Sequence, residues 1–199
     1  MLYWIARNII RVLAVVVWRA RAKGTGNVPR TGPVIIACNH LSYLDPPVMG
    51  SFVPRMVRYM AKRELFEIPV FGPAIRAVGA YPVDREGSAT AAIKRSLEVL
   101  RAGGCIGIFP EGGRNTEGSK EARAGVALLA SLAKAPVVPA AIVGGDKAKR
   151  LGAIKVAFGP PMSLPTDRKA TREELEKFTQ QTMDAIGALI KDIGGDSEG

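Results

Sequence analysis

The residue best suited to acid–base chemistry is His40, the only histidine in the sequence. Asp45 follows five residues later, directly before Pro46 and Pro47. An imidazole exchanges a proton near neutral pH, which suits general-base catalysis. A carboxylate bonded to its other ring nitrogen would fix the tautomer and stabilise the imidazolium that forms. The pair therefore predicts a general base with an orienting carboxylate.

A structural interpretation of the same two residues stays open at this point. A histidine at a strand end is often a polar residue that the backbone satisfies. Asp45 also has the features of a helix N-cap, because proline at the next position is favoured in the first helical turn. A capping carboxylate keeps its second oxygen free, so the cap and the catalytic pair are compatible.

Two apolar runs position the candidate residues. Residues 33–38 form a predicted buried strand that ends two residues before His40, and residues 105–109 form a second one that leads into Pro110 and Glu111. Strands alternate with helical patterns along the chain, which predicts a single-domain α/β fold with a mixed, largely parallel sheet flanked by helices. The other expected strands cover residues 56–60, 79–85, 137–143 and 154–158, and the expected helices cover residues 45–52, 71–78, 88–101, 122–134 and 171–193. The last helix is expected to begin with a capping box, because Glu174 follows Thr171 by three residues.

The composition limits the environment and the partners. The chain has 28 basic and 18 acidic residues, a formal net charge of +10, which favours anionic partners such as lipid headgroups, phosphates, an acidic carrier protein or nucleic acid. Cys38 and Cys105 both lie in apolar runs and are interpreted as buried thiols of a reducing compartment. The sequence has no Cys/His cluster that predicts a structural zinc site.

Residues 1–22 are expected to form an amphipathic helix in the membrane interface. The segment is strongly apolar, but its longest uninterrupted run, residues 12–18, is far shorter than a membrane span of about 20 residues. Tyr3, Trp4 and Trp18 suit the headgroup boundary, and nearby arginines suit anionic lipid. An ordinary core helix is the alternative. Residues 23–193 then form the globular domain, and residues 194–199 a disordered tail.

Four sequence blocks together resemble a known family. Asn39-His40-x-x-x-x-Asp45, followed by Phe109-Pro110-Glu111-Gly112-x-Arg114, resembles the PlsC-type glycerolipid acyltransferases, the 1-acylglycerol-3-phosphate O-acyltransferases. Residues 62–85 resemble the second block of that family, and residues 138–142 resemble the fourth. The blocks occur in the family order over roughly residues 30–160. The first and third blocks are specific, whereas the second and fourth are weak alone.

The resemblance implies the glycerolipid acyltransferase fold and acyl transfer from acyl-CoA or acyl carrier protein to the sn-2 hydroxyl of lysophosphatidic acid, giving phosphatidic acid. His40 would deprotonate the hydroxyl and Asp45 would orient His40, without a serine or cysteine nucleophile. No cofactor beyond the thioester co-substrate and no metal is expected. The implied location is the cytoplasmic face of the cell membrane, with an anionic membrane surface and no nucleic acid as partner.

The resemblance also implies residues that bind the substrate. Arg114 offers a planar fork for the acceptor phosphate, with added charge from Arg85 and Lys62. Glu111 would hold Arg114 or a substrate hydroxyl, and backbone N–H groups near Gly112 would bind the oxyanion. Arg85 and Lys62 also fit an ordinary solvated surface, because charged residues flank both of them.

The third block departs from the family pattern in two positions. This chain has Gly113 where the family usually has Thr or Ser, and Asn115 where it usually has Ser. The departure leaves the acceptor open among lysophosphatidic acid, glycerol 3-phosphate, another lysophospholipid and an amino-acid lipid.

Two different classes of function compete with acyl transfer. The first is a non-catalytic basic module that binds a membrane or nucleic acid, which the net charge alone would suit. The few aromatic residues and the lack of a nucleic-acid-binding motif argue against it. The second is a P-loop or dinucleotide enzyme. The glycine-rich stretches at residues 24–26 and 144–145 do not have the full phosphate-loop spacing, which argues against this class.

Overall fold

The strand that precedes His40 lies at the centre of the sheet. In the computed structural model, which describes residues 2–83, 89–111, 125–146, 148, 151–164, 168 and 170–194, β2 (Val34–Cys38) is the middle strand of seven, in the order β1-β7-β6-β2-β5-β3-β4. Every described pair of neighbouring strands is parallel except β6 and β7. The expected α/β fold with a mixed, largely parallel sheet is confirmed.

The observed elements follow the expected order closely. The other strands are β1 (Arg21–Lys23), β3 (Val57–Lys62), β4 (Tyr81–Val83), β5 (Cys105–Ile108), β6 (Val137–Val143) and β7 (Lys155–Phe158). The helices are α1 (Leu2–Trp18), η1 (Thr25–Asn27), α2 (Asp45–Phe52), η2 (Arg63–Phe66), α3 (Phe71–Ala77), α4 (Ala89–Arg101), α5 (Gly125–Ala133) and α6 (Arg172–Gly194). The expected starts at residues 88 and 122 lie outside the described residues. The expected tail of residues 194–199 begins one residue too early, because Gly194 is the last residue of α6, and the rest of that tail lies outside the described residues.

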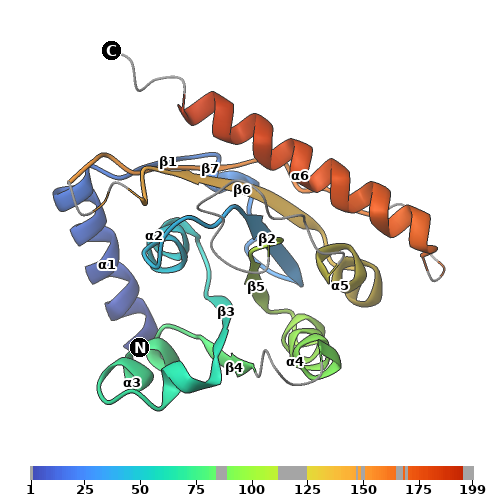
Figure 1. Ribbon diagram of the computed structural model, residues 1–199, viewed down its shortest axis with the longest axis horizontal. Coiled ribbons are helices and arrows are strands. Elements are labelled where there is room, and N and C mark those ends of the chain that lie inside the picture. The colour runs from blue at the N-terminus through green and yellow to red at the C-terminus, as the bar shows by residue number, and fades with distance from the viewer. Residues whose placement is uncertain are drawn as a thin grey trace.

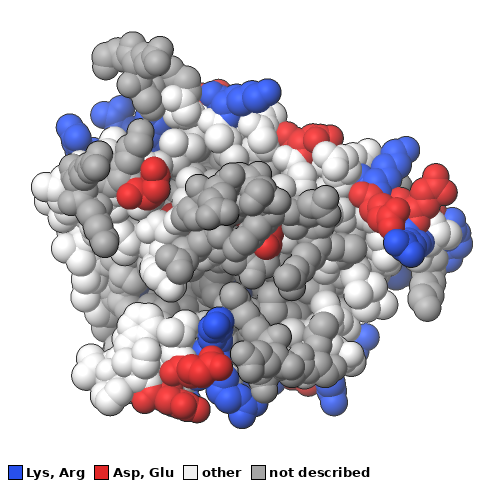
Figure 2. All heavy atoms as spheres, viewed as in Figure 1, with Lys and Arg blue, Asp and Glu red and all other residues white. Residues whose placement is uncertain are grey.

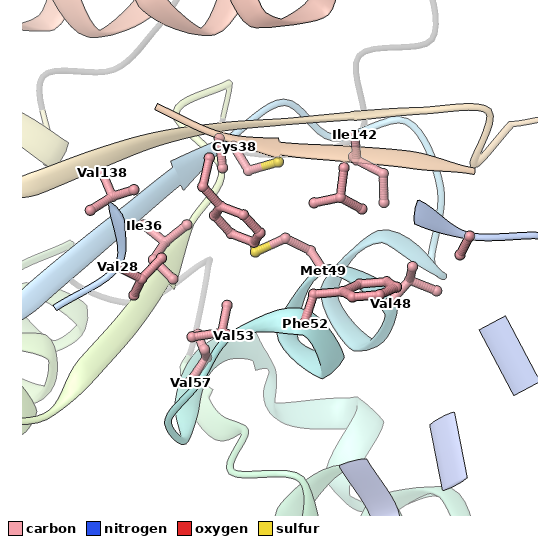
Figure 3. Close-up of a cluster of buried hydrophobic side chains, with 14 of the residues drawn as sticks. Val28, Ile36, Cys38, Val48, Met49, Phe52, Val53, Val57, Val138 and Ile142 are labelled. Atoms are coloured by element: carbon pink, nitrogen blue, oxygen red, sulfur yellow. The ribbon is translucent and has the colours of Figure 1, made fainter. Parts of the chain in front are cut away.

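Helices cover both faces of the sheet, so β2 is apolar on both sides. Alternate residues of β2 point to opposite faces: Ile36 and Cys38 join a cluster with α1 and α2, whereas Ile35 and Ala37 join a cluster with α4, α5 and α6. Figure 1 shows α1 and α2 on one side of the sheet and the other three long helices on the opposite side. In Figure 3, Met49 of α2 points into the first cluster.

The C-terminal helix α6 begins as its sequence predicts. The Thr171 backbone N–H donates to Glu174 Oε2 at 2.7 Å, and the Glu174 backbone N–H donates to Thr171 Oγ1 at 3.3 Å. These two reciprocal bonds form the capping box and satisfy two N–H groups that the helix itself leaves without partners.

The N-terminal helix is shorter than expected. It ends at Trp18, and the expectation of a helix up to residue 22 is wrong, because Arg19 has a positive φ of 48° and Ala20 N–H closes the helix on Ala14 O. Residues 21–23 instead form strand β1, which pairs in parallel with β7. The N-terminal segment is therefore part of the sheet as well as a helix packed on α2.

Two aromatic residues of the N-terminal segment form hydrogen bonds with the rest of the protein. Tyr3 is buried, and its hydroxyl donates to Arg55 O at 3.4 Å and accepts from Val57 N–H at 3.1 Å. Trp18 Nε1 donates to Ala148 O at 2.9 Å. The assignment of Tyr3 to the headgroup boundary is therefore wrong. Trp18 is half-buried and Trp4 is exposed, so their assignment stays a prediction.

The side of α1 that faces away from the protein is apolar and exposed. None of the described helices combines the length and the apolar character needed to cross a bilayer. A helix that is apolar on its solvent side as well as on its packed side leaves a large apolar area uncovered. We call this surface the outer face of α1; its residues are Leu2, Ile5, Ile9, Val12, Leu13 and Val16.

Candidate active site

The candidate residues gather at one edge of the sheet because of its topology. β2, β3, β4, β5 and β6 all run parallel, so their carboxyl ends meet at the same edge. Open α/β sheets bind ligands outside this edge. β2 leads to His40, β5 leads to Glu111, and β3 ends at Lys62. The strand pattern therefore places all three predicted blocks on a common side of the fold.

His40 and Asp45 form the predicted pair. His40 Nδ1 lies 3.1 Å from Asp45 Oδ2. The His40 side chain is 13% exposed, whereas the Asp45 side chain is completely buried. A buried carboxylate on Nδ1 fixes the ring orientation and leaves Nε2 as the nitrogen available to a substrate.

Asp45 is held by the loop between β2 and α2. Its Oδ2 also accepts the backbone N–H groups of Leu41 and Ser42, each at 2.6 Å. Asp45 is the first residue of α2, and the cap position belongs to Leu44. The N-cap interpretation of Asp45 is therefore wrong: its carboxylate turns back to the preceding loop instead of capping the helix.

An aromatic stack supports the His40 ring from the β5 side. The Phe109 ring lies 4.1 Å from the His40 ring, centroid to centroid, at an interplanar angle of 22°. Tyr59 of β3 stacks behind Phe109 with centroids 6.2 Å apart. Stacking on one face and the carboxylate at Nδ1 together restrict the imidazole to one orientation.

Asn39 ties the His40 loop to β6. Its side chain is buried, donates from Nδ2 to Ile142 O at 2.9 Å and accepts Ile142 N–H at Oδ1 at 2.8 Å. The amide thus continues the pairing of β2 and β6 beyond Cys38, where the backbone of β2 leaves the sheet. The sequence motif contains Asn39, but its role depends on which strand lies beside β2, which spacing does not reveal.

Glu111 lies close enough to contact the histidine backbone. The His40 N–H donates to Glu111 Oε2 at 3.4 Å, a long hydrogen bond. This contact joins the first and third sequence blocks at the carboxyl ends of β2 and β5. The second carboxylate oxygen, Oε1, is not engaged by that bond.

The predicted binding residues are placed only in part. Lys62 is exposed at the end of β3, two strands from β2, roughly 10 Å at the usual strand spacing. Arg85, Gly112 and Arg114, and with them Gly113, lie outside the described residues. Their roles as phosphate and oxyanion ligands stay predictions.

The two cysteines are buried free thiols, as the sequence predicts. Burial raises the pKa of the Cys38 thiol well above its usual value, and the charges of Asp45 and Glu111 raise it further. Burial also raises the pKa of Cys105 to about 12. A thiol acts as a nucleophile through its thiolate, so neither cysteine is suited to attack a substrate.

Comparison with known proteins agrees with this geometry. The family model described as "Acyltransferase" matches residues 19–143. The chain is 33% identical over 197 residues to the 1-acyl-sn-glycerol-3-phosphate acyltransferase of Bacillus subtilis, covering 96% of both proteins. It is 30% identical over 201 residues to the enzyme of that name from Pseudomonas aeruginosa, covering 94% of this chain and 75% of that protein.

A solved structure shares the fold. The 1-acyl-sn-glycerophosphate (LPA) acyltransferase PlsC from Thermotoga maritima superimposes with a TM-score of 0.72 and 23% identity, covering 92% of this chain and 79% of that one. The sequence match over most of the chain and the matching fold lead to one conclusion: the chain belongs to the acyltransferase family.

Proposed function

We propose that this protein transfers a fatty acyl group from a thioester donor to the sn-2 hydroxyl of 1-acylglycerol 3-phosphate, giving phosphatidic acid. The observation that carries the proposal is the 3.1 Å contact between His40 Nδ1 and the buried Asp45 carboxylate at the carboxyl edge of the sheet. The names of the relatives support the acceptor. The donor is an acyl-CoA or an acylated carrier protein, whose anionic soluble part complements the net charge of +10.

The reaction needs no covalent enzyme intermediate. His40 Nε2 takes the proton of the acceptor hydroxyl while the oxygen attacks the thioester carbonyl carbon. The carbon–sulfur bond then breaks, the new ester bond remains, and the leaving thiolate takes the proton back from the imidazolium. Asp45 keeps the proton-accepting nitrogen directed at the substrate and stabilises the imidazolium between the two transfers.

Glu111 and the basic residues of the neighbouring loops are proposed to hold the acceptor. Arg114 binds its phosphate with Arg85 and Lys62 nearby, and backbone N–H groups near Gly112 bind the oxyanion of the tetrahedral intermediate. The contact of Glu111 with the His40 backbone supports this arrangement, because it brings the third sequence block to the base.

A membrane surface is the proposed source of the acceptor, at the cytoplasmic face of the cell membrane. The outer face of α1 exposes large apolar side chains, among them Val16 at 72% exposure. Figure 2 shows few charged side chains at the left edge of the molecule, where α1 lies. Apolar residues on an interfacial helix bind to the boundary between headgroups and acyl chains.

The segment before α3 extends this apolar surface. Ile68, Val70 and Phe71 are exposed, Val70 at 83%, and α3 contacts α1. Val70 also has a positive φ of 67°, which is costly for a β-branched residue. We include residues 68–71 in the proposed membrane surface together with the outer face of α1.

The test of the reaction follows thiol release from palmitoyl-CoA in the presence of 1-acylglycerol 3-phosphate. We expect release that requires the acceptor, and a loss of at least about a hundredfold in kcat for His40→Ala. Asp45→Asn replaces the carboxylate with an uncharged amide of similar size, so it tests whether the negative charge is needed. Release that survives His40→Ala would contradict the proposal.

The acceptor is tested separately from the mechanism. A panel of glycerol 3-phosphate, other lysophospholipids and amino-acid lipids is compared by kcat/KM with 1-acylglycerol 3-phosphate. Activity that requires His40 but prefers another acceptor would keep the mechanism and replace the substrate. Acyl-CoA and acyl carrier protein thioesters are compared in the same way as donors.

A further inference from the structure

The turn after β6 lies against the Asp45 carboxylate. Gly145 is buried two residues beyond the end of β6. A methyl group added to its Cα would overlap Asp45 Oδ1 and would lie 3.3 Å from Ser42 Cβ and 3.4 Å from Asp45 Cγ. The space at position 145 is therefore already filled by the acidic member of the pair.

The two carboxylate oxygens of Asp45 have different surroundings. Oδ2 receives His40 Nδ1 and two backbone N–H groups, whereas Oδ1 is buried without a hydrogen-bond partner among the described residues. A hydrogen bond to Oδ1 would hold that oxygen in place, because hydrogen bonds are directional. Among the described residues, packing against Gly145 and not a hydrogen bond limits the position of that oxygen.

A side chain at position 145 is excluded by the atoms around the Cα of Gly145 and not by the backbone conformation of that residue. Its neighbour Gly144 has a φ of 89°, which disfavours any side chain, but Gly145 has no positive φ. An alanine at position 145 is therefore compatible with the backbone, and its methyl group must displace the carboxylate. Such a variant tests the position of the carboxylate directly.

We infer that Gly145 is a positioning residue that holds Asp45 Oδ2 against His40 by leaving no room behind Oδ1. This inference rests on the proposed function, in which Asp45 orients the base. Together with Asn39, which bonds to Ile142 of β6, Gly145 makes the end of β6 a third support of the catalytic pair, beside the β2 loop and Phe109.

The first test observes the imidazole without any substrate. His40 is the only histidine, so protein without a histidine tag gives one set of imidazole nitrogen signals in NMR. At pH 8 we expect the proton on Nδ1 in the native protein, because Nδ1 faces the carboxylate. Gly145→Ala should shift the tautomer toward Nε2–H, and we expect the same shift in Asp45→Ala. An unchanged tautomer in Gly145→Ala would overturn the inference.

The second test is a double-mutant cycle in the acyl-transfer assay. Gly145→Ala should lower kcat by at least about tenfold and change the acceptor KM by less than about threefold, because the orientation of the base is lost and not the binding of substrate. In the Asp45→Ala background the same change should cost nothing further. Equal losses in both backgrounds would overturn the role through Asp45.

Controls separate this role from general destabilisation. Gly187→Ala in α6 meets no atom within 4 Å and should keep the native tautomer and kcat. If Gly145→Ala alone does not fold, the double variant with Asp45→Ala must fold as Asp45→Ala does, since the overlapping oxygen is gone; failure there overturns the inference. The NMR result stands even if the acyl-transfer assay contradicts the proposed function, so the two failures are distinguishable.

Discussion

Asn39 ties the loop of the proposed base to the sheet through two hydrogen bonds to one residue of β6. We expect Asn39→Ala to lower the free energy of unfolding by about 1–3 kcal/mol, because both backbone groups of Ile142 lose their partner in a buried place. It should also lower kcat by displacing the adjacent His40. Urea unfolding and the thiol-release assay measure the two effects.

A second asparagine that bonds to the backbone of a strand serves as the control for that prediction. Asn27 Nδ2 donates to Phe158 O of β7 at 2.9 Å from an exposed position. Asn27→Ala should cost less stability and leave kcat unchanged. A full kcat in Asn39→Ala would show that the bonds to Ile142 do not position the base.

Thiol modification should leave the enzyme active. At pH 8 the raised pKa values of Cys38 and Cys105 keep both thiols protonated, since a group with a pKa above the ambient pH retains its proton. We expect the native protein to keep full activity after iodoacetamide treatment, with both thiols alkylated only after unfolding in denaturant. Mass spectrometry counts the alkylated cysteines; rapid native alkylation with loss of activity would contradict this expectation.

The residue level also shows what the sequence can and cannot predict. The His40–Asp45 pair is predicted, because both residues belong to one short loop whose spacing is local. The contacts of Asn39, Phe109 and Gly145 are not predicted, since they depend on β5 and β6 lying on either side of β2. The cap assigned to Asp45 is wrong because the loop N–H groups of Leu41 and Ser42 take its carboxylate.

At the scale of elements, α1 and the segment before α3 are expected to dock on the membrane together. Acidic residues on the outer face of α1 should weaken this proposed docking without unfolding the protein, because the native side chains are exposed. We expect Ile9→Asp/Val16→Asp to reduce binding to anionic vesicles at least about tenfold. Vesicle sedimentation measures binding, and circular dichroism checks the fold.

The control uses an equally apolar side chain on another helix. Leu132 of α5 is 42% exposed, so Leu132→Asp should bind vesicles as the native protein does. Binding that persists in the double variant of α1 would refute the outer face as the docking surface. Val70→Asp tests the second part of the surface and should weaken binding less.

Element boundaries followed the sequence where the signals were local. Strands β2 and β6 and the capping box of α6 were predicted from apolar runs and from the Thr171 and Glu174 spacing. The end of α1 is not predicted, because residues 18–22 continue the helical pattern of the sequence. Residues 21–23 instead pair with the edge of β7 and form strand β1. Tertiary pairing overrides local propensity there.

For the whole molecule, the charge of +10 would add an electrostatic attraction to the proposed apolar docking. We expect binding to anionic vesicles to weaken strongly between about 0.1 and 1 M salt, over which the screening length falls from about 10 to 3 Å. Zwitterionic vesicles should show weak binding at both concentrations. Binding to anionic vesicles that does not respond to salt would exclude the charge as a contributor.

The anchoring of Tyr3 beneath β3 has a kinetic consequence. Because its hydroxyl bonds to Arg55 and Val57, the N-terminal helix is joined rigidly to the catalytic body and is not a flexible tether. On the proposed membrane surface such an enzyme would work at a fixed height above the bilayer and would meet its acceptor by lateral diffusion. Its turnover should therefore follow the mole fraction of the acceptor in the lipid plane, and diluting that plane with inert lipid should slow the reaction even when the total acceptor in the sample is unchanged.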